Sequence, residues 1–119
     1  MQSFWNLKVW EKSHELVLEI YKITKSFPKE EMYGMTSQIR RSAVSIPSNI
    51  AEGCCRGSET DFKRFLQIAV GSASELEYQL YLAKDLQYTD NNNYEIIKTK
   101  VIEVKRMLSS LINKLKADN

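Results

Sequence analysis

Hydrophobic residues recur at helical spacing in four long segments of the chain. The first segment, about residues 7–26, has two neighbouring apolar stripes, a face wider than one adjacent helix needs. Phe27-Pro28 ends it, because the residue before a proline is disfavoured in the α region. The two stripes consist of Trp10, His14, Val17, Tyr21 and Thr24, and of Val9, Leu16, Ile20 and Ile23.

The second segment, about residues 29–56, contains a proline inside its helical pattern. Because an interior proline removes a backbone hydrogen bond and crowds the preceding turn, we expect a kink at Pro47. Gly53 and Gly57 are typical of a helix end. The predicted core stripe consists of Met32, Met35, Ile39, Ala43, Ile46 and Ile50.

The third and fourth segments, about residues 59–87 and 92–117, each follow capping residues. Ser58 with Asp61 three residues later is a variant of the capping box, and Asp90 precedes the fourth segment. No segment shows the alternating pattern of a strand. The apolar stripes consist of Phe62, Phe65, Ala69, Ala73, Leu76, Leu80 and Ala83, and of Ile97, Val101, Val104, Leu108, Leu111 and Leu115.

These segments predict an all-α fold in one domain, residues 1–119. Short loops make neighbouring helices antiparallel, so the expected architecture is an up-down-up-down four-helix bundle. A chain of 119 residues is long enough to bury one real core. The small residues Ala69 and Ala73 would let a partner helix approach closely.

Composition narrows the class of protein without naming a function. Seventeen basic and fifteen acidic residues give a net charge of +2, far from the excess of a histone-like protein. The N-terminal region lacks the pattern of a signal peptide, and no apolar run approaches the roughly 20 residues of a membrane span. The expected localisation is cytoplasmic, with no membrane association.

Candidate catalytic and metal-binding residues are few. His14 is the sole histidine, so a two-metal bundle site cannot be completed within one chain, and its stripe predicts a hydrogen-bonded histidine in the core. Cys54 and Cys55 are adjacent and form no metal-binding pair. We predict no enzyme, no metal and no cofactor. An enzyme that uses a cysteine thiol, with Arg56 lowering the pKa of that thiol, stays open as a further hypothesis.

Hydrogen-bonding residues form a stripe beside the apolar face of the second segment. Gln38, Ser45 and Asn49 lie on one side of the helix with Ser42, and Arg40 and Arg41 precede most of them. The stripe is either a polar flank that satisfies backbone groups near Pro47 and pairs with another helix, or a recognition surface. The two interpretations are compatible. Arg56 and Glu52 extend the stripe at its end.

The outer side of the third segment predicts a subunit interface. It carries little charge, and a glycine within a helix costs stability unless something packs close to it. Gly71 and Tyr78 are its central candidates, together with Gln67, Ser74 and Tyr81.

Basic residues concentrate near the end of the chain. Residues 58–90 carry three basic and six acidic residues, whereas residues 91–119 carry six basic and three acidic. Lys98, Lys105 and Lys116 share one stripe of the fourth helix, which is usually a solvated face. If copies assembled with these stripes aligned, they would form a cationic surface for phosphates.

A family resemblance rests on several runs distributed along the chain. The runs are Phe27-Pro28, Tyr33 to Arg41 (YGMTSQIRR), Ser45 to Gly53 (SIPSNIAEG), Ile68 to Ser72 (IAVGS) and Glu75 to Glu77 (ELE). Over residues 7–115 the chain resembles the bacterial four-helix-bundle proteins encoded in 23S ribosomal RNA intervening sequences.

This resemblance implies a four-helix bundle and a ring-like homo-oligomer, with five subunits as the expected number. The family is also similar to the accessory protein of diversity-generating retroelements, a pentameric barrel that binds reverse transcriptase and nucleic acid through a basic surface. The family has no catalytic residues that could be assigned to positions of this chain.

Two hypotheses for function follow. The leading one is a non-enzymatic homo-oligomeric bundle that acts as an accessory or scaffold associated with RNA, with Arg40, Arg41, Arg56 and the lysines of the fourth helix as contacts. The alternative is a protein-interaction module with no nucleic-acid role, in which the Gln38 to Asn49 stripe or the central opening of an oligomer holds another protein. Salt separates the two, because phosphate contacts weaken steeply as salt rises.

Overall fold

The computed structural model describes residues 3–117 of the chain, with side chains as far as residue 115. Four long helices account for most of it, and two short 3-10 helices precede the first and second of them. In chain order the elements are η1 (Phe4–Asn6), α1 (Lys8–Thr24), η2 (Lys29–Glu31), α2 (Met35–Cys54), α3 (Glu59–Asp85) and α4 (Asn91–Ala117).

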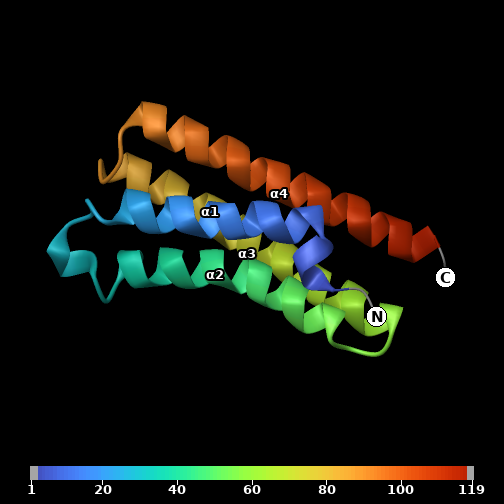
Figure 1. Ribbon diagram of the computed structural model, residues 1–119. Helices are drawn as coiled ribbons and strands as arrows, with labels where there is room; N and C mark the ends of the chain where they lie inside the picture. The colour runs from blue at the N-terminus through green and yellow to red at the C-terminus, as the bar shows by residue number, and fades with distance from the viewer. Residues whose placement is uncertain (1–2, 118–119) are drawn as a thin grey trace.

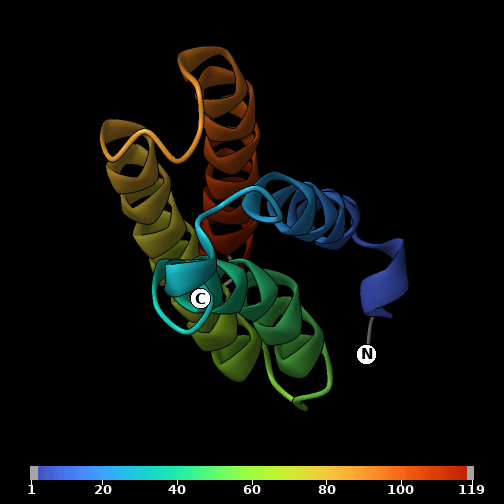
Figure 2. The same cartoon turned by 90° about the vertical axis from the view of Figure 1, so that its left-hand side faces the viewer.

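The four helices form an antiparallel up-and-down bundle, as predicted (Figure 1). Each helix packs against the one before it in the chain, and α4 returns to contact α1, so the helices lie at four corners when viewed along the bundle (Figure 2). The bundle measures 46 × 23 × 20 Å, consistent with 27-residue helices at about 1.5 Å per residue.

All four helices contribute to one apolar core. The stripes predicted for the third and fourth segments supply its centre, where Ala69, Ala73 and Leu76 of α3 and Val101 and Leu108 of α4 are fully buried. The two alanines lie in the closely packed interior, as the sequence predicted. Removing this apolar surface from water is the main driving force that holds the helices together.

The second segment differs from its prediction at its start. Instead of one helix over 29–56, residues 29–31 form η2, and α2 begins only at Met35 because Gly34, with φ −112° and ψ −111°, is not helical. Met32, predicted to be in the core, is 55% exposed. The other helix boundaries lie within two residues of their predicted positions, and α2 continues without interruption through Pro47.

Glu31 joins the two loops at this end of the bundle. Its Oε1 accepts a hydrogen bond from the Met35 backbone N–H at 3.0 Å, and its Oε2 accepts one from the Tyr88 hydroxyl at 2.8 Å. The bond from Met35, and secondly that from Tyr88, holds the pKa of Glu31 below its ordinary value. This carboxylate therefore caps α2 and ties it to the connection between α3 and α4.

Candidate functional site

Arg40 lies on the side of α2 that faces α1. Its Nε donates to Thr24 Oγ1 at 2.8 Å, and its Nη2 donates to the Tyr21 carbonyl at 3.4 Å. Its guanidinium carbon also lies 4.5 Å from the centroid of the Tyr21 ring. These contacts place a cation at the C-terminal end of α1, where the helix dipole favours it. Arg40 therefore links two helices, and its charge is engaged within the fold.

Two other residues predicted to contact phosphate, Arg56 and Lys105, form ion pairs with acidic side chains. Arg56 Nη2 lies 2.8 Å from Glu52 Oε2, and its guanidinium carbon lies 5.0 Å from the ring centroid of Phe65. Lys105 Nζ lies 2.9 Å from Glu77 Oε1 of α3, and both side chains are 32% exposed. Because each cation already faces a carboxylate, each offers less attraction to a phosphate.

The predicted lysine stripe of α4 is therefore only partly free. Lys98 is half-buried, and its Nζ lies 5.8 Å from the ring centroid of Tyr94. Lys105 is paired with α3, and the side chain of Lys116 lies outside the described residues. Of the two described lysines in this stripe, Lys98 alone lacks an ion-pair partner.

Arg41 has a different environment from its neighbour Arg40. Its side chain is exposed and has no hydrogen-bond or ion-pair partner within residues 3–117. It lines an open groove of about 550 Å³ between α2 and α3. The other lining residues are Tyr33, Ser37, Gln38, Ser42, Ser45, Ser72, Glu75 and Gln79. We call this surface the α2–α3 groove.

Polar contacts between the two helices hold the α2–α3 groove in place. Ser42 Oγ donates to Glu75 Oε1 at 3.3 Å, and the hydroxyls of Ser45 and Ser72 lie 2.8 Å apart. Asn49 Nδ2 donates back to the Ser45 carbonyl at 2.7 Å. The polar stripe of α2 thus pairs with another helix, and the same residues line the open surface above it. Gln38, at the edge of the stripe, is exposed.

Gln79 is the unusual member of the α2–α3 groove. Its side chain is 8% exposed, and its Oε1 is the one buried side-chain oxygen or nitrogen without a hydrogen-bond partner in the described part of the chain. Leaving a buried polar group unpaired costs about 1–3 kcal/mol. Because this oxygen is itself buried, it is an unpaired polar group within the helix contact and not a group that a ligand in the groove would meet.

Below the groove, the same two helices come into close contact. Gly53 is buried, and a Cβ atom added there would lie 2.9 Å from both Phe62 Cδ1 and Phe65 Cβ. Only a residue without a side chain allows this approach. Gly53 therefore acts as a packing residue one position before the end of α2, within the region where the sequence predicted that the helix ends. Pro47 is also buried, whereas Glu52 is exposed at the surface.

The outer face of α3 is exposed, in agreement with its predicted position outside the core. Gly71 is exposed, and a Cβ atom added there would meet nothing within 4 Å. Tyr78, Tyr81 and Ile68 are 62%, 48% and 43% exposed. Within a single chain, nothing packs against Gly71, so its interface role stays a prediction.

The candidates for catalysis have ordinary surroundings. His14 is exposed and stacks on Trp10 at 5.3 Å, so its predicted place in the core is wrong. Cys54 is buried and Cys55 is exposed. Burial raises the pKa of the Cys54 thiol, and Cys55 adds to this effect, which is the opposite of an activated nucleophile. Among the described residues, no three metal-ligating side chains cluster, and no helix is long and apolar enough to span a membrane.

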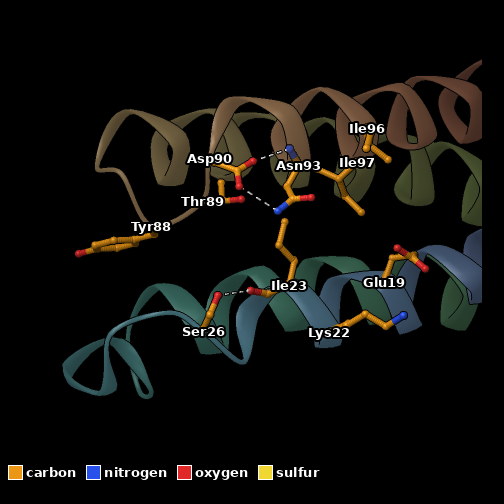
Figure 3. Close-up of a pocket in the computed structure, with 10 residues that line it drawn as sticks. All are labelled: Glu19, Lys22, Ile23, Ser26, Tyr88, Thr89, Asp90, Asn93, Ile96 and Ile97. Atoms are coloured by element: carbon orange, nitrogen blue, oxygen red, sulfur yellow. Dashed lines mark hydrogen bonds between the residues drawn. The ribbon is translucent and has the colours of Figure 1, made fainter.

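A second cavity, of about 390 Å³, lies between α1 and α4. Figure 3 shows Ile23 and Ser26 on the α1 side facing Asn93 and Ile97 across it. Both of its carboxylates are already used: Asp90 accepts hydrogen bonds from the backbone and side chain of Asn93 at 2.7 and 3.2 Å, and Glu19 Oε1 lies 3.7 Å from Lys100 Nζ. This cavity is a gap beside a helix cap, so the α2–α3 groove is the stronger candidate site.

The fold and surface define a class: an all-α four-helix bundle with a polar groove between its second and third helices. Comparison with known protein families then assigns the chain to a particular family. The family model for 23S rRNA-intervening sequence proteins matches residues 5–110, and the chain belongs to this family.

A solved structure supports the same assignment. It is a protein of unknown function from the S23 ribosomal protein family of Bacteroides thetaiotaomicron, with 35% sequence identity and a TM-score of 0.82. The match covers 88% of this chain and 95% of that one. A comparison with curated proteins finds no match. Neither the family nor this neighbour indicates a catalytic activity.

Proposed function

We propose that the chain is a subunit of a homo-oligomeric, non-catalytic scaffold that associates with RNA. The observation that carries the proposal is the exposed, weakly charged face of α3 around Gly71 and Tyr78. Exposed helix surfaces normally carry more charge, and aromatic residues are enriched where proteins associate. Five subunits are the number that the family resemblance favours.

The RNA part of the proposal is supported by the family and by the remaining free cations. Arg41 is exposed and unpaired among the described residues, and residues 106–117, which follow the paired Lys105, contain three basic and no acidic residues. Repetition in a ring would multiply these charges. Phosphate contacts accumulate in this way, because each one releases a counterion and adds to affinity.

Size-exclusion chromatography with light scattering, recording protein and nucleic-acid absorbance at low and high salt, tests both parts. We expect a discrete oligomer that carries RNA and releases it at high salt. A monomer contradicts the scaffold. A discrete oligomer that binds no RNA at either salt contradicts the RNA part.

Substitution of Gly71 tests the interface directly. Gly71→Arg should leave the helical fold intact, because the added side chain meets nothing within 4 Å in the single chain, and should convert the oligomer into monomers. Ser109→Arg is the matched control, since it adds the same charge at an exposed position of α4. Equal oligomer content in both variants contradicts the assignment of this face.

A protein-interaction module without RNA is the second candidate. It is favoured by one observation: Arg40, Arg56 and Lys105, three of the six predicted phosphate contacts, are engaged within the chain. Under this hypothesis, a partner protein bound to the oligomer should be retained at high salt, because an interface that is largely apolar depends little on ionic strength.

A further inference from the structure

The α2–α3 groove combines three kinds of chemical group. Arg41 supplies a free guanidinium, Glu75 a carboxylate, and Tyr33 an aromatic ring. They come from α2, from α3 and from the loop before α2, so the fold rather than local sequence brings them to one surface. A volume of about 550 Å³ is of the size that accommodates small organic ligands.

Tyr33 has no packing role that explains its position. It is 94% exposed, the highest value among the large apolar side chains of the described residues. A ring so exposed contributes almost nothing to the core. Exposed aromatic rings at the edge of a polar groove are suited to stack against a flat ligand, and unpaired RNA bases stack on protein side chains in this way.

Glu75 has unused capacity to accept hydrogen bonds. Its Oε1 accepts from Ser42 at 3.3 Å, and its other oxygen has no partner among the residues described. A carboxylate offers about four lone-pair sites, so it can still accept two donors from one ligand.

These groups together restrict the ligand. An inorganic phosphate would use Arg41 and nearby hydroxyls such as Ser37 but would leave Tyr33 and Glu75 unused, and a cationic side chain attracted by Glu75 would be opposed by Arg41. A nucleotide supplies a phosphate for Arg41 and a flat base for Tyr33. Among the four RNA bases, guanine presents adjacent N–H donors at N1 and N2, which match the two oxygens of a carboxylate.

We propose that the α2–α3 groove binds a guanine nucleotide of single-stranded RNA. The base stacks on Tyr33, its N1–H and N2–H donate to Glu75, and the phosphate lies against Arg41. The inference rests on the RNA part of the proposed function and adds a base preference to it. In an oligomer, each subunit contributes one such groove.

Two labelled RNA probes test the inference by fluorescence anisotropy: a uridine oligomer of about eight nucleotides and the same oligomer with one central guanosine. We expect the guanosine probe to bind about tenfold more tightly, as is typical of one bidentate base contact. Guanosine monophosphate should displace the guanosine probe, whereas the same concentration of inorganic phosphate or adenosine monophosphate should not.

Glu75→Gln isolates the base contact. Glutamine retains an acceptor for Ser42 but replaces one carboxylate oxygen with a donor, so it should abolish the guanosine preference and leave binding of the uridine probe unchanged. Glu95→Gln, the same change at an exposed position of α4, should retain the full preference. Tyr33→Ala should weaken the binding of both probes several-fold, because stacking on an aromatic ring does not depend on base identity.

The outcomes separate this inference from the proposed function. If neither probe binds, the RNA part of the proposed function fails, and the inference fails with it. If both probes bind equally, or if Glu75→Gln retains the guanosine preference, the inference alone is overturned. If inorganic phosphate displaces the guanosine probe as effectively as guanosine monophosphate does, the groove binds phosphate without recognising the base, and the inference is also overturned.

Discussion

The two halves of the contact between α2 and α3 differ in what separates the helices. Near the end of α2, Gly53 lies directly against Phe62 and Phe65, with no room for another carbon atom. Toward the start of α2, serine and glutamate side chains bridge the helices and an open groove remains. The same helix pair is thus closed by a glycine at one end and held open by polar groups at the other.

This difference shows how a regular bundle acquires a site. Helix spacing follows the size of the residues at the contact, so a glycine draws the backbones together, and larger polar side chains leave space that water or a ligand fills. A second contrast lies between the two sides of α2, where the neighbouring residues Arg40 and Arg41 have different surroundings. Arg40 is bonded to α1, and Arg41 remains free at the groove.

The largest expected effect is at the closed half. Gly53→Ala gains about 1 kcal/mol of helix propensity. It must also fit a Cβ atom at 2.9 Å from Phe62 Cδ1 and from Phe65 Cβ, and because Phe65 Cβ is fixed to its own backbone, the cost should lie near the upper end of the about 1–3 kcal/mol of overpacking. We expect a net loss of stability by urea denaturation. Gly57→Ala, where nothing lies within 4 Å, should change stability by less than about 0.5 kcal/mol. A Gly53→Ala variant as stable as the parent contradicts the close contact.

The two arginines give the next largest contrast. Arg40→Ala removes two hydrogen bonds and a ring contact between α1 and α2, and should lower the free energy of unfolding by about 1–2 kcal/mol. Arg41→Ala removes no described bond and should change it by less than about 0.5 kcal/mol. Chemical denaturation of both variants checks the contrast, and equal losses would show that Arg41 also supports the fold.

A smaller effect of opposite sign is expected inside the groove half. Gln79→Leu replaces a buried amide whose oxygen has no partner with an apolar side chain of similar size. Because this relieves an unpaired buried group, thermal unfolding should show a gain of about 0.5–1 kcal/mol. A loss of stability would indicate that the amide is satisfied in solution, and that the groove is better hydrated than its lining suggests.

The smallest effect concerns the loops that border the groove. The pKa of Glu31 is held below its ordinary value of 4.5, so its stabilising contribution is complete above that value and is lost as pH falls through the lower folded value. The hydrogen bond to Glu31 likewise raises the pKa of Tyr88 above 10.0, so a second loss is expected as pH rises beyond that value.

Glu31→Gln tests this pH dependence, because glutamine can still accept from the Met35 N–H but does not titrate. Melting temperatures measured from neutral pH to below 4.5 should fall more steeply for the parent chain than for the variant. Parallel curves would show that the Glu31 contacts to Met35 and Tyr88 are not maintained in solution.

The sequence predicted the bundle well because helical periodicity, caps and the core stripes all depend on local residue order. It missed the break at Gly34, because Pro28 and the acidic residues after it resemble an ordinary helix start. Of the stripe that contains Trp10 and His14 only Thr24 is buried, so the core side of α1 is the neighbouring stripe of Val9, Leu16 and Ile20.

The candidate site was predictable only in part. The polar stripe of α2 marked one wall of the groove, and the runs that carry the family resemblance include Tyr33 and Glu75. Nothing in the sequence showed that Glu75 and Gln79 of α3 meet this stripe, since that depends on how two helices align. The sequence likewise did not show that Arg40 would be hydrogen-bonded to α1 and Arg41 free at the groove, because this depends on which side of α2 faces α1.

The salt dependence of RNA binding by Arg41→Gln is the most direct test of the central claim, that the scaffold contacts RNA through the α2–α3 groove. Lys105→Gln is the comparison, because Lys105 is already paired with Glu77. We predict that Arg41→Gln weakens binding and lowers the slope of log affinity against log salt by about 1 for each phosphate that is no longer neutralised, with a much smaller change for Lys105→Gln. An unchanged affinity and slope for Arg41→Gln, together with weaker binding by Lys105→Gln, would contradict the account and move the RNA-binding surface to α4.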